Sequence, residues 1–94
     1  MIAVGLLTVD LQIPASRSLK SKRKVVSSIT SRLRQRFNVA VAEVDFMDKW
    51  QRSRIGISAI SNDSQVVESQ LRKALEMIEG TGSAVVLDSE FEIL

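Results

Sequence analysis

The sequence predicts an α+β domain in which one sheet is covered on one face by two helices. Four segments alternate apolar and polar residues with the two-residue period of strands, and two segments repeat apolar residues with the period of a helix. Their order is β-α-β-β-α-β. Two right-handed crossovers joined by a hairpin then give an antiparallel sheet of strand order 4-1-3-2, the ferredoxin-like arrangement. The 94 residues are expected to form a single domain, 1–94.

The first half of the chain supplies one strand and one helix. The alternating segment Ile2–Ile13 predicts a strand, and Pro14 ends it because proline cannot donate to a strand ladder. A helix follows with Ser18 as its N-cap, and Asn38 is expected to take the left-handed conformation in which helices end. The buried face of this helix repeats at helical spacing through Leu19, Val26, Ile29, Leu33 and Phe37.

The second half supplies a hairpin, a helix and the last strand. Strands are expected over Val39–Phe46 and Arg52–Ser61, joined by a turn at 47–51. Residues 61–63 read Ser-Asn-Asp, a dense capping signal, and the helix after them runs to about Glu79, where a Gly-Thr-Gly sequence stops it. The last strand is expected over Ala84–Leu94. Across the hairpin, ion pairs are expected between the outward residues Arg52 and Arg54 and the outward residues Glu43 and Asp45.

Composition excludes several kinds of chemistry. The chain has no Cys and no His, which removes thiol chemistry, zinc-thiolate sites and the usual general base, and we expect no metal and no cofactor. No apolar run is long enough to cross a bilayer, so a cytoplasmic protein is expected. No nucleotide-binding loop or catalytic triad is present. Phosphate handling by Arg17, with Asn62 as partner, is the one enzymatic alternative, and a non-enzyme is the expectation.

Positive charge concentrates on the first helix. Residues 17–36 hold eight cations and no acid, although the net charge of the chain is only +2. Cations at the start of a helix face the positive end of its dipole, so an anion bound there would relieve a real penalty. We therefore expect this helix to contact phosphate; a lysine-rich solvated surface is the alternative. Lys22 falls near the apolar side and is expected to extend outward along its stem. The expected contacts are Arg17, Lys20, Arg23, Lys24 and Arg34.

The sheet lacks the aromatic residues of the usual RNA-recognition surface. Neither central strand contains one, and the three phenylalanines, at positions 37, 46 and 91, are predicted to lie in the core. Trp50, in the hairpin turn, is the fourth aromatic residue. Trp50 and Arg52 could form a second contact region, whereas packing of Trp50 over the hairpin end and pairing of Arg52 across the strands are the structural alternatives.

The sheet face that the helices leave open is predicted to carry an apolar patch. Such a patch favours a second copy of the chain, which would give a homodimer, although neighbouring long side chains could also cover it. The residues expected on this face from strand parity are Ile2, Val4, Leu6, Val39, Val41 and Val86.

Three short motifs resemble the bacterial YlxP-like family, a domain of unknown function. They are Ser-Leu-Lys-Ser-Lys-Arg at 18–23, Asp-Lys-Trp-Gln-Arg at 48–52 and Ser-Asn-Asp at 61–63. The resemblance extends over nearly the whole chain and implies a ferredoxin-like fold. Genes of this family often lie near those for translation initiation factor two and ribosome-binding factor A, which implies a role around translation or ribosome assembly.

Two functions follow from these observations. The first is a non-catalytic RNA- or ribosome-associated module that contacts phosphates through the basic first helix. The second is a dimeric regulatory or protein-interaction domain that uses the open sheet face. Binding that weakens with salt supports the first function, whereas a dimer that does not retain RNA supports the second.

Overall fold

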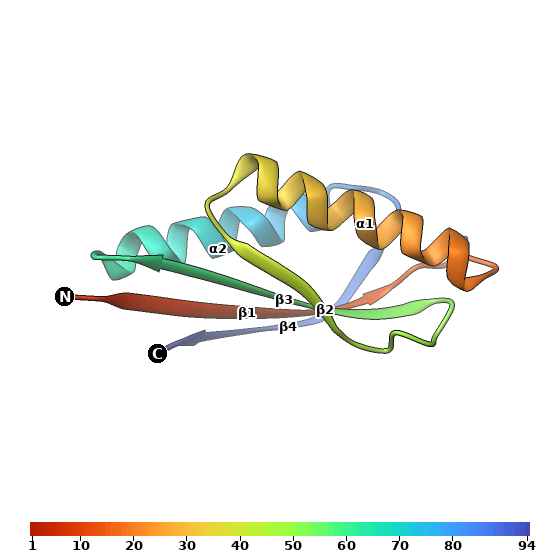
Figure 1. Cartoon of the computed structure of the whole chain (residues 1–94), viewed down its shortest axis with the longest axis horizontal. Coiled ribbons are helices and arrows are strands. Elements are labelled where there is room, and N and C mark those ends of the chain that lie inside the picture. The colour runs from red at the N-terminus through yellow and green to blue at the C-terminus, as the bar shows by residue number, and fades with distance from the viewer.

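The computed structural model describes all 94 residues and has the predicted element order (Figure 1). The sheet order is β2-β3-β1-β4, which is the predicted order 4-1-3-2 read from the other edge, and every neighbouring pair is antiparallel. The fold is thus α+β and ferredoxin-like. The elements are β1 (Ala3–Gln12), α1 (Leu19–Arg36), β2 (Ala40–Asp45), β3 (Arg52–Ser61), α2 (Ser64–Glu79) and β4 (Val85–Ile93).

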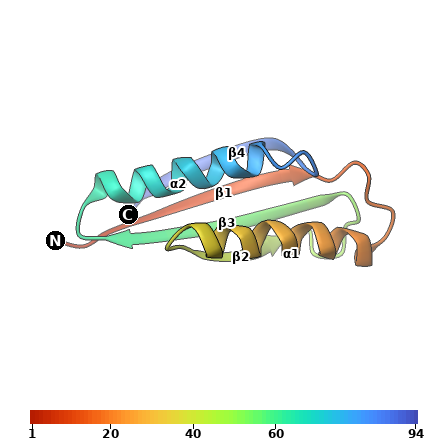
Figure 2. The same ribbon diagram turned by 90° about the horizontal axis from the view of Figure 1, so that it is seen from above.

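Both helices lie on one face of the sheet and leave the other face open (Figure 1). Seen from above, α1 runs along the β2 side and α2 along the side of β1 and β4 (Figure 2). The molecule is elongated, with principal extents of 45 × 20 × 17 Å. Neither helix combines the length and the apolarity that crossing a membrane requires.

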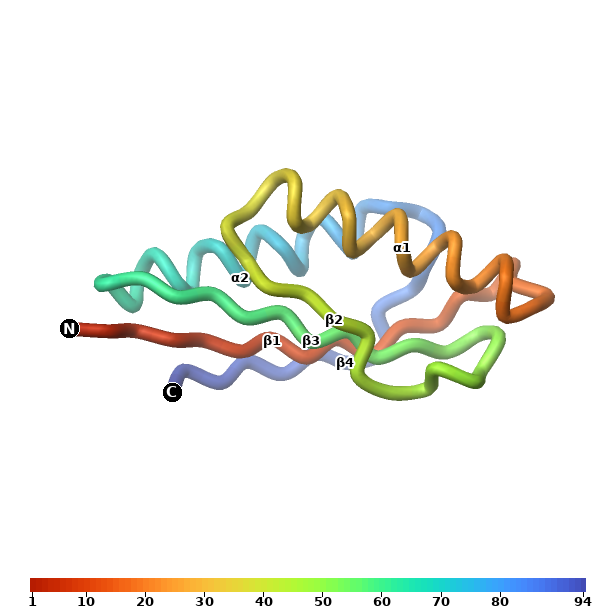
Figure 3. Tube along the Cα trace, in the orientation of Figure 1, coloured from red at the N-terminus to blue at the C-terminus, as the bar shows by residue number.

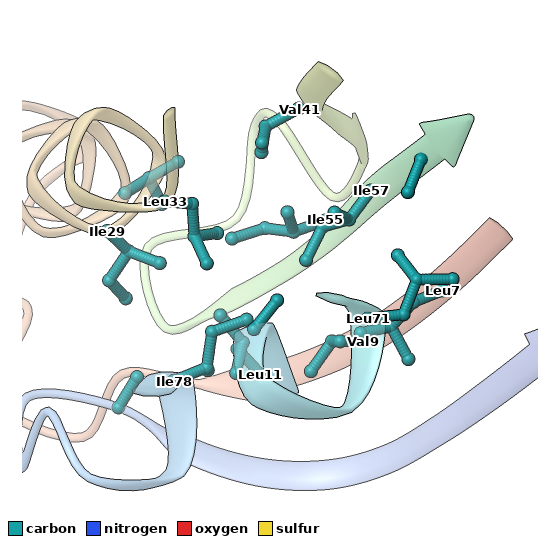
Figure 4. Close-up of a cluster of buried hydrophobic side chains, with 14 of the residues drawn as sticks. Leu7, Val9, Leu11, Ile29, Leu33, Val41, Ile55, Ile57, Leu71 and Ile78 are labelled. Atoms are coloured by element: carbon teal, nitrogen blue, oxygen red, sulfur yellow. The ribbon is translucent and has the colours of Figure 1, made fainter. Parts of the chain in front are cut away.

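The core lies between the sheet and the helices (Figure 4). Alternate residues of β1 and β3 point into it, because successive side chains of a strand face opposite ways. α2 approaches β1 closely at Gly5, where a Cβ atom would lie 2.5 Å from Val67 Cγ1 and 2.8 Å from Leu71 Cδ1. Fully buried core residues include Leu7, Val9, Leu11, Ile29, Leu33, Ile55, Ile57, Leu71 and Ile78.

The helix starts follow the capping predictions, and the end of α1 does not. Ser18 Oγ accepts a hydrogen bond from Ser21 N at 3.0 Å, and Asp63 Oδ1 accepts one from Gln65 N at 2.9 Å. The left-handed conformation predicted for Asn38 is wrong, because Phe46 is the only non-glycine residue with a positive φ. α1 instead ends at Phe37, whose extended backbone leads directly towards β2.

β-bulges reverse the predicted faces of parts of the two edge strands. In β4, Asp88 is opposite Asp10 and Val86 is opposite Leu11, which leaves Leu87 without a partner. The extra residue shifts the alternation, so Val86 packs against the core and Val85 is exposed. The prediction that Val86 lies on the open face is therefore wrong.

β2 also presents the opposite face to the one predicted. Val41 is only 8% exposed and Val39 packs against the core, so neither lies on the open face. Ala40 and Ala42 face solvent instead. The physical reason is that valine removes more apolar surface from water than alanine does. A bulge at Val44 then returns Asp45 to the open face, opposite Arg54.

Candidate nucleic-acid interface

Three serine hydroxyls build the turn that leads into α1. Ser18 caps the first turn of the helix, as described above. Ser21 Oγ accepts from Arg17 N at 3.2 Å, donates to Ser18 O at 3.2 Å and lies 2.9 Å from Ser16 Oγ. This network satisfies groups that a helix start leaves unpaired and fixes the path of the backbone into α1.

Lys22 lies inside the protein, and the prediction that it extends outward is wrong. Its side chain has no exposed surface, and its ammonium lies 2.8 Å from Glu43 Oε2. The ammonium also donates to Phe46 O at 2.7 Å and to Met47 O at 3.4 Å. Glu43 is held in turn by Ser53 Oγ at 2.6 Å. Lys22 thus joins α1 to β2 and the hairpin, and it is not available to a ligand.

The other cations in the first half of α1 are exposed and carry no ion pair. The three salt bridges of the structure involve Lys22 or Arg54 only. No acidic residue lies in the first turn of the helix. Lys20, Arg23 and Lys24 share a shallow depression on the outer surface of α1 with three serines. We call the following four exposed cations the basic helix face: Arg17, Lys20, Arg23 and Lys24.

Arg34 lies apart from the basic helix face. It is ten residues beyond Lys24, about 15 Å along the helix axis. Its Nη2 donates to Val41 O at 2.7 Å, so the guanidinium holds the backbone of the edge strand β2. The structure therefore gives Arg34 a structural partner and does not join it to the other predicted phosphate contacts.

Arg52 lies on the opposite side of the sheet from α1. It is paired with Gln12 in the ladder, and its Cζ lies 4.7 Å from the centroid of the Phe46 ring. Phe46 is also covered by Arg54 at 5.0 Å and is not part of the core, so its predicted core position is wrong. A sharp backbone turn at Phe46, with φ of 61°, accompanies this placement. Arg52 and the basic helix face cannot contact the same short stretch of ligand.

Trp50 lies near the start of α1, because its neighbour Gln51 binds the loop that precedes the helix. Gln51 Nε2 donates to Ser16 O at 3.0 Å and to Pro14 O at 3.3 Å. The hairpin turn and this loop meet at the same end of the molecule (Figure 3). Trp50 is 56% exposed, so the hairpin leaves more than half of it uncovered. The structure thus brings the hairpin turn that carries Trp50 to the same end of the molecule as the start of the basic helix face.

A second polar cluster, on the open face, centres on Arg54. Arg54 Nε lies 2.5 Å from Asp10 Oδ1, and Nη1 lies 3.0 Å from Asp45 Oδ2. The hydrogen bond from Arg54 lowers the pKa of Asp10, and the same contact raises the pKa of Arg54. The predicted pairing of Arg54 with Asp45 is confirmed, whereas Glu43 pairs with Lys22 in place of Arg52.

A polar cavity of about 310 Å³ adjoins this cluster. It is lined by Thr8, Asp10, Arg54, Asp88, Ser89 and Glu90. No group of three or more acidic side chains is arranged to hold a metal ion.

The structure separates the two residues of the enzymatic alternative. Arg17 follows the end of β1 at Gln12, whereas Asn62 follows Ser61, which is opposite Ala3 at the other end of that strand. Nine residues of strand place them about 30 Å apart. Arg17 and Asn62 therefore cannot act on one phosphate.

The apolar part of the open face differs in membership from the prediction. Ile2, Val4 and Leu6 lie there as predicted, and Ile60 lies opposite Val4 with 62% of its surface exposed. Alternation along β3 could have identified Ile60. We call this set the open apolar patch: Ile2, Val4, Leu6, Ala40, Ala42, Val44 and Ile60.

These features define a small ferredoxin-like α+β domain with one basic helix face and an open sheet face. Residues 4–91 match the family described as "Protein of unknown function (DUF503)", and the chain belongs to this family. It is 34% identical over 76 residues to a protein named "Uncharacterized protein YlxP" from Bacillus subtilis, covering 81% of this chain and 83% of that protein.

Two solved structures share the fold. The de novo designed protein Foldit4 aligns with a TM-score of 0.60 and 12% identity, covering all of this chain and 97% of the other. A C-terminal segment of the alpha subunit of aIF2 from Pyrococcus abyssi aligns with a TM-score of 0.52 and 18% identity, covering 97% of this chain and 49% of the other. At these identities the likeness shows the fold alone.

Proposed function

We propose that this protein is a non-catalytic, cytoplasmic RNA-binding module, acting on free RNA or on RNA in a ribosomal particle. The observation that carries the proposal is the basic helix face, whose four cations are exposed and have no carboxylate partner. Lys22 and Arg54 are the two cations with acidic partners, and other exposed cations, such as Arg72 and Lys73, are also unpaired. The four cations of the basic helix face differ from the other unpaired cations because they lie together at the start of one helix, which supports contact with several phosphates of one RNA strand.

The helix dipole strengthens the argument. The positive end of the α1 dipole lies at its first turn, where Ser18 caps the amide of Ser21, and cations added there raise the local potential further. A phosphate is an anion that would use both the side chains and the helix start. Serine hydroxyls beside the cations, on the same outer surface, add neutral donors of the kind that contact phosphate and sugar.

Anisotropy of a labelled RNA measured against salt concentration tests this proposal. Four phosphate contacts give a slope of log affinity against log salt near −3. Replacing Lys20, Arg23 and Lys24 with Ala should remove most of the binding and leave a slope near −1. A matched control replaces Arg32, Arg72 and Lys73 with Ala, which removes the same charge from other exposed helix positions. Equal losses in the two variants would contradict a local site.

The open apolar patch favours a second function, self-association as a regulatory or interaction domain. Ile2, Val44 and Ile60 are each more than half exposed. A two-fold axis parallel to the strands would place Ile60 of one copy over Val4 of the other, so that the open apolar patches of the two copies pack against each other. The patch covers about 300 Å² of sheet, below the ~800 Å² per partner of stable interfaces. We therefore expect a weak dimer, in equilibrium with the monomer, whose fraction rises with protein concentration.

Light scattering over a range of protein concentrations tests self-association. The average mass should rise with concentration, and Ile60→Lys should hold the protein as a monomer. Val66→Lys is the matched control, because Val66 is exposed on α2 and lies outside the patch. A mass that stays monomeric up to about 1 mM, or equal effects of the two variants, would exclude this function.

A further inference from the structure

Of the four aromatic residues, Trp50 is the one that is exposed at the end of the molecule where the basic helix face begins. Phe37 packs against the core, and Phe46 is covered by two guanidinium groups. Phe91 is 47% exposed, so its predicted core position is wrong, but it is opposite Leu7 in the middle of β1, on the β4 edge and away from the start of α1. The central strands carry no aromatic residue, so the open sheet face offers no stacking surface.

The hairpin that carries Trp50 is held in place from two sides. Lys22 bonds the carbonyl groups of Phe46 and Met47 at its start. At its end, the side chain of Gln51 bonds two carbonyl groups of the loop before α1, and Gln51 O accepts from Ile13 N at 2.9 Å. The indole is thus exposed on a fixed support, and little conformational entropy is lost when a ligand packs on it.

We propose that the ligand of this site is single-stranded RNA, with one unpaired base stacked on Trp50 while the adjoining phosphates lie along the basic helix face. This inference rests on the proposed RNA-binding function and specifies its substrate class. Trp50 flanks Gln51, and Arg17 flanks Ser16, to which Gln51 is bonded. Trp50 and Arg17 are therefore each one residue away from this contact, at the end of the molecule where α1 begins.

A duplex does not fit this arrangement. The bases of double-stranded RNA are stacked on one another, and the deep, narrow major groove hides their edges from side chains. Cations alone would bind a duplex at least as well as a single strand, because the duplex has the higher charge density. The exposed tryptophan is the feature that favours an unpaired base.

Fluorescence of the protein provides a direct test, because Trp50 is the only tryptophan. We expect an unstructured RNA of about ten nucleotides to quench the emission, and a blunt duplex of the same sequence to bind more weakly with little quenching. Trp50→Ala should weaken single-strand binding about tenfold and Trp50→Phe much less. The salt slope should not change in either variant, because neither removes a charge.

Met47→Ala is the matched control, since Met47 is exposed on the same hairpin turn. It should leave single-strand affinity unchanged, whereas a loss equal to that of Trp50→Ala would indicate a general disturbance of the hairpin and overturn the stacking role. Binding seen by anisotropy without quenching, or equal affinity for duplex and single strand, would overturn the single-strand inference and leave phosphate binding intact. No binding of either RNA would overturn the proposed function as well.

Discussion

Lys22 shows how one side chain can organise a site without taking part in it. Its ammonium is enclosed by a carboxylate and two carbonyl groups, so it fixes the distance between the start of α1 and the hairpin that carries Trp50. A buried ammonium is tolerated only when it is paired with an anion and hydrogen-bonded. The carboxylate and the two carbonyl groups meet both conditions for Lys22. The exposed cations on either side of it remain available for ligand.

Replacing Lys22 with Ala should destabilise the protein by about 3–5 kcal/mol, because it leaves the largely buried carboxylate of Glu43 without its cation. Urea unfolding followed by circular dichroism measures the change. Lys20→Ala is the control and should alter the free energy of unfolding by less than about 0.5 kcal/mol, since Lys20 is exposed. A loss below about 1 kcal/mol for Lys22→Ala would show that the enclosed ion pair does not hold the hairpin.

The pair formed by Asp10 and Arg54 predicts a dependence of stability on acid. The pKa of Asp10 is lower in the folded protein than in the unfolded chain, because Arg54 donates hydrogen bonds to its carboxylate. The unfolded chain therefore binds the proton first as pH falls, and the stabilising contribution is complete above about pH 5. The stabilising contribution decreases as pH falls below about 4, and it is lost as pH falls through the pKa of Asp10 in the folded protein.

Comparing wild type with Asp10→Asn by urea unfolding at pH 7 and pH 2.5 checks this dependence. The wild type should be the more stable of the two at pH 7, and the difference should shrink at pH 2.5, because the unfolded chain binds the proton at that pH while Arg54 lowers the pKa of Asp10 in the folded protein. Asp48→Asn, in the exposed hairpin turn without an ion pair, is the control. A difference that is the same at both pH values would mean that the charge of Asp10 does not stabilise the fold.

The packing of α2 on β1 depends on the absence of a side chain at Gly5. Gly5→Ala should cost about 1–3 kcal/mol, because the new methyl group would overlap Val67 and Leu71, both fully buried. Gly56→Ala is a matched control, since its nearest atom is Val44 Cγ1 at 3.2 Å on an exposed side chain that can move. Urea unfolding compares the two variants, and equal losses would contradict close packing as the cause.

The elements were predictable where the cause is local. Ser18 and Asp63 cap their helices through hydrogen bonds to amides two or three residues away, so their positions follow from the sequence. The two β-bulges depend on pairing with another strand, and no residue type at Val44 or Leu87 indicates them. This is why the strand order was predicted correctly and three residues of the open face were not.

The site was predictable in part for the same reason. Lys20, Arg23 and Lys24 point outward because of helical periodicity alone, which the sequence contains. The burial of Lys22 follows from Glu43, 21 residues away, and the position of Trp50 follows from contacts of Gln51 with a distant loop. Each contact has one residue in a motif that resembles the YlxP-like family, Lys22 or Gln51, but its partner lies outside the three motifs and is set by the tertiary structure.

The basic helix face and an acidic edge lie on different parts of the protein. The basic helix face lies on the outer surface of the helical layer, whereas Asp88, Glu90 and Glu92 lie exposed along β4 with no ion pair. A sheet and a packed helix layer are separated by about 10 Å, which is close to the Debye length of ~8–10 Å near physiological salt. Screening should therefore keep the acidic edge from cancelling the attraction of the basic face.

Because the acids of β4 lie apart from the basic helix face, replacing them distinguishes a local RNA site from a general effect of net charge. Replacing Asp88, Glu90 and Glu92 with their amides raises the formal net charge of +2 by three, as much as the triple Ala variant of α1 lowers it. If contacts at the basic helix face determine affinity, this change should strengthen RNA binding less than about twofold at 0.15 M salt, because salt weakens interactions between exposed charges that are about a Debye length apart. Anisotropy with the same labelled RNA measures it. A gain in RNA affinity as large as the loss caused by removing the three α1 cations would mean that the overall charge of the protein determines RNA binding. In that case α1 would be a charged surface without a local site.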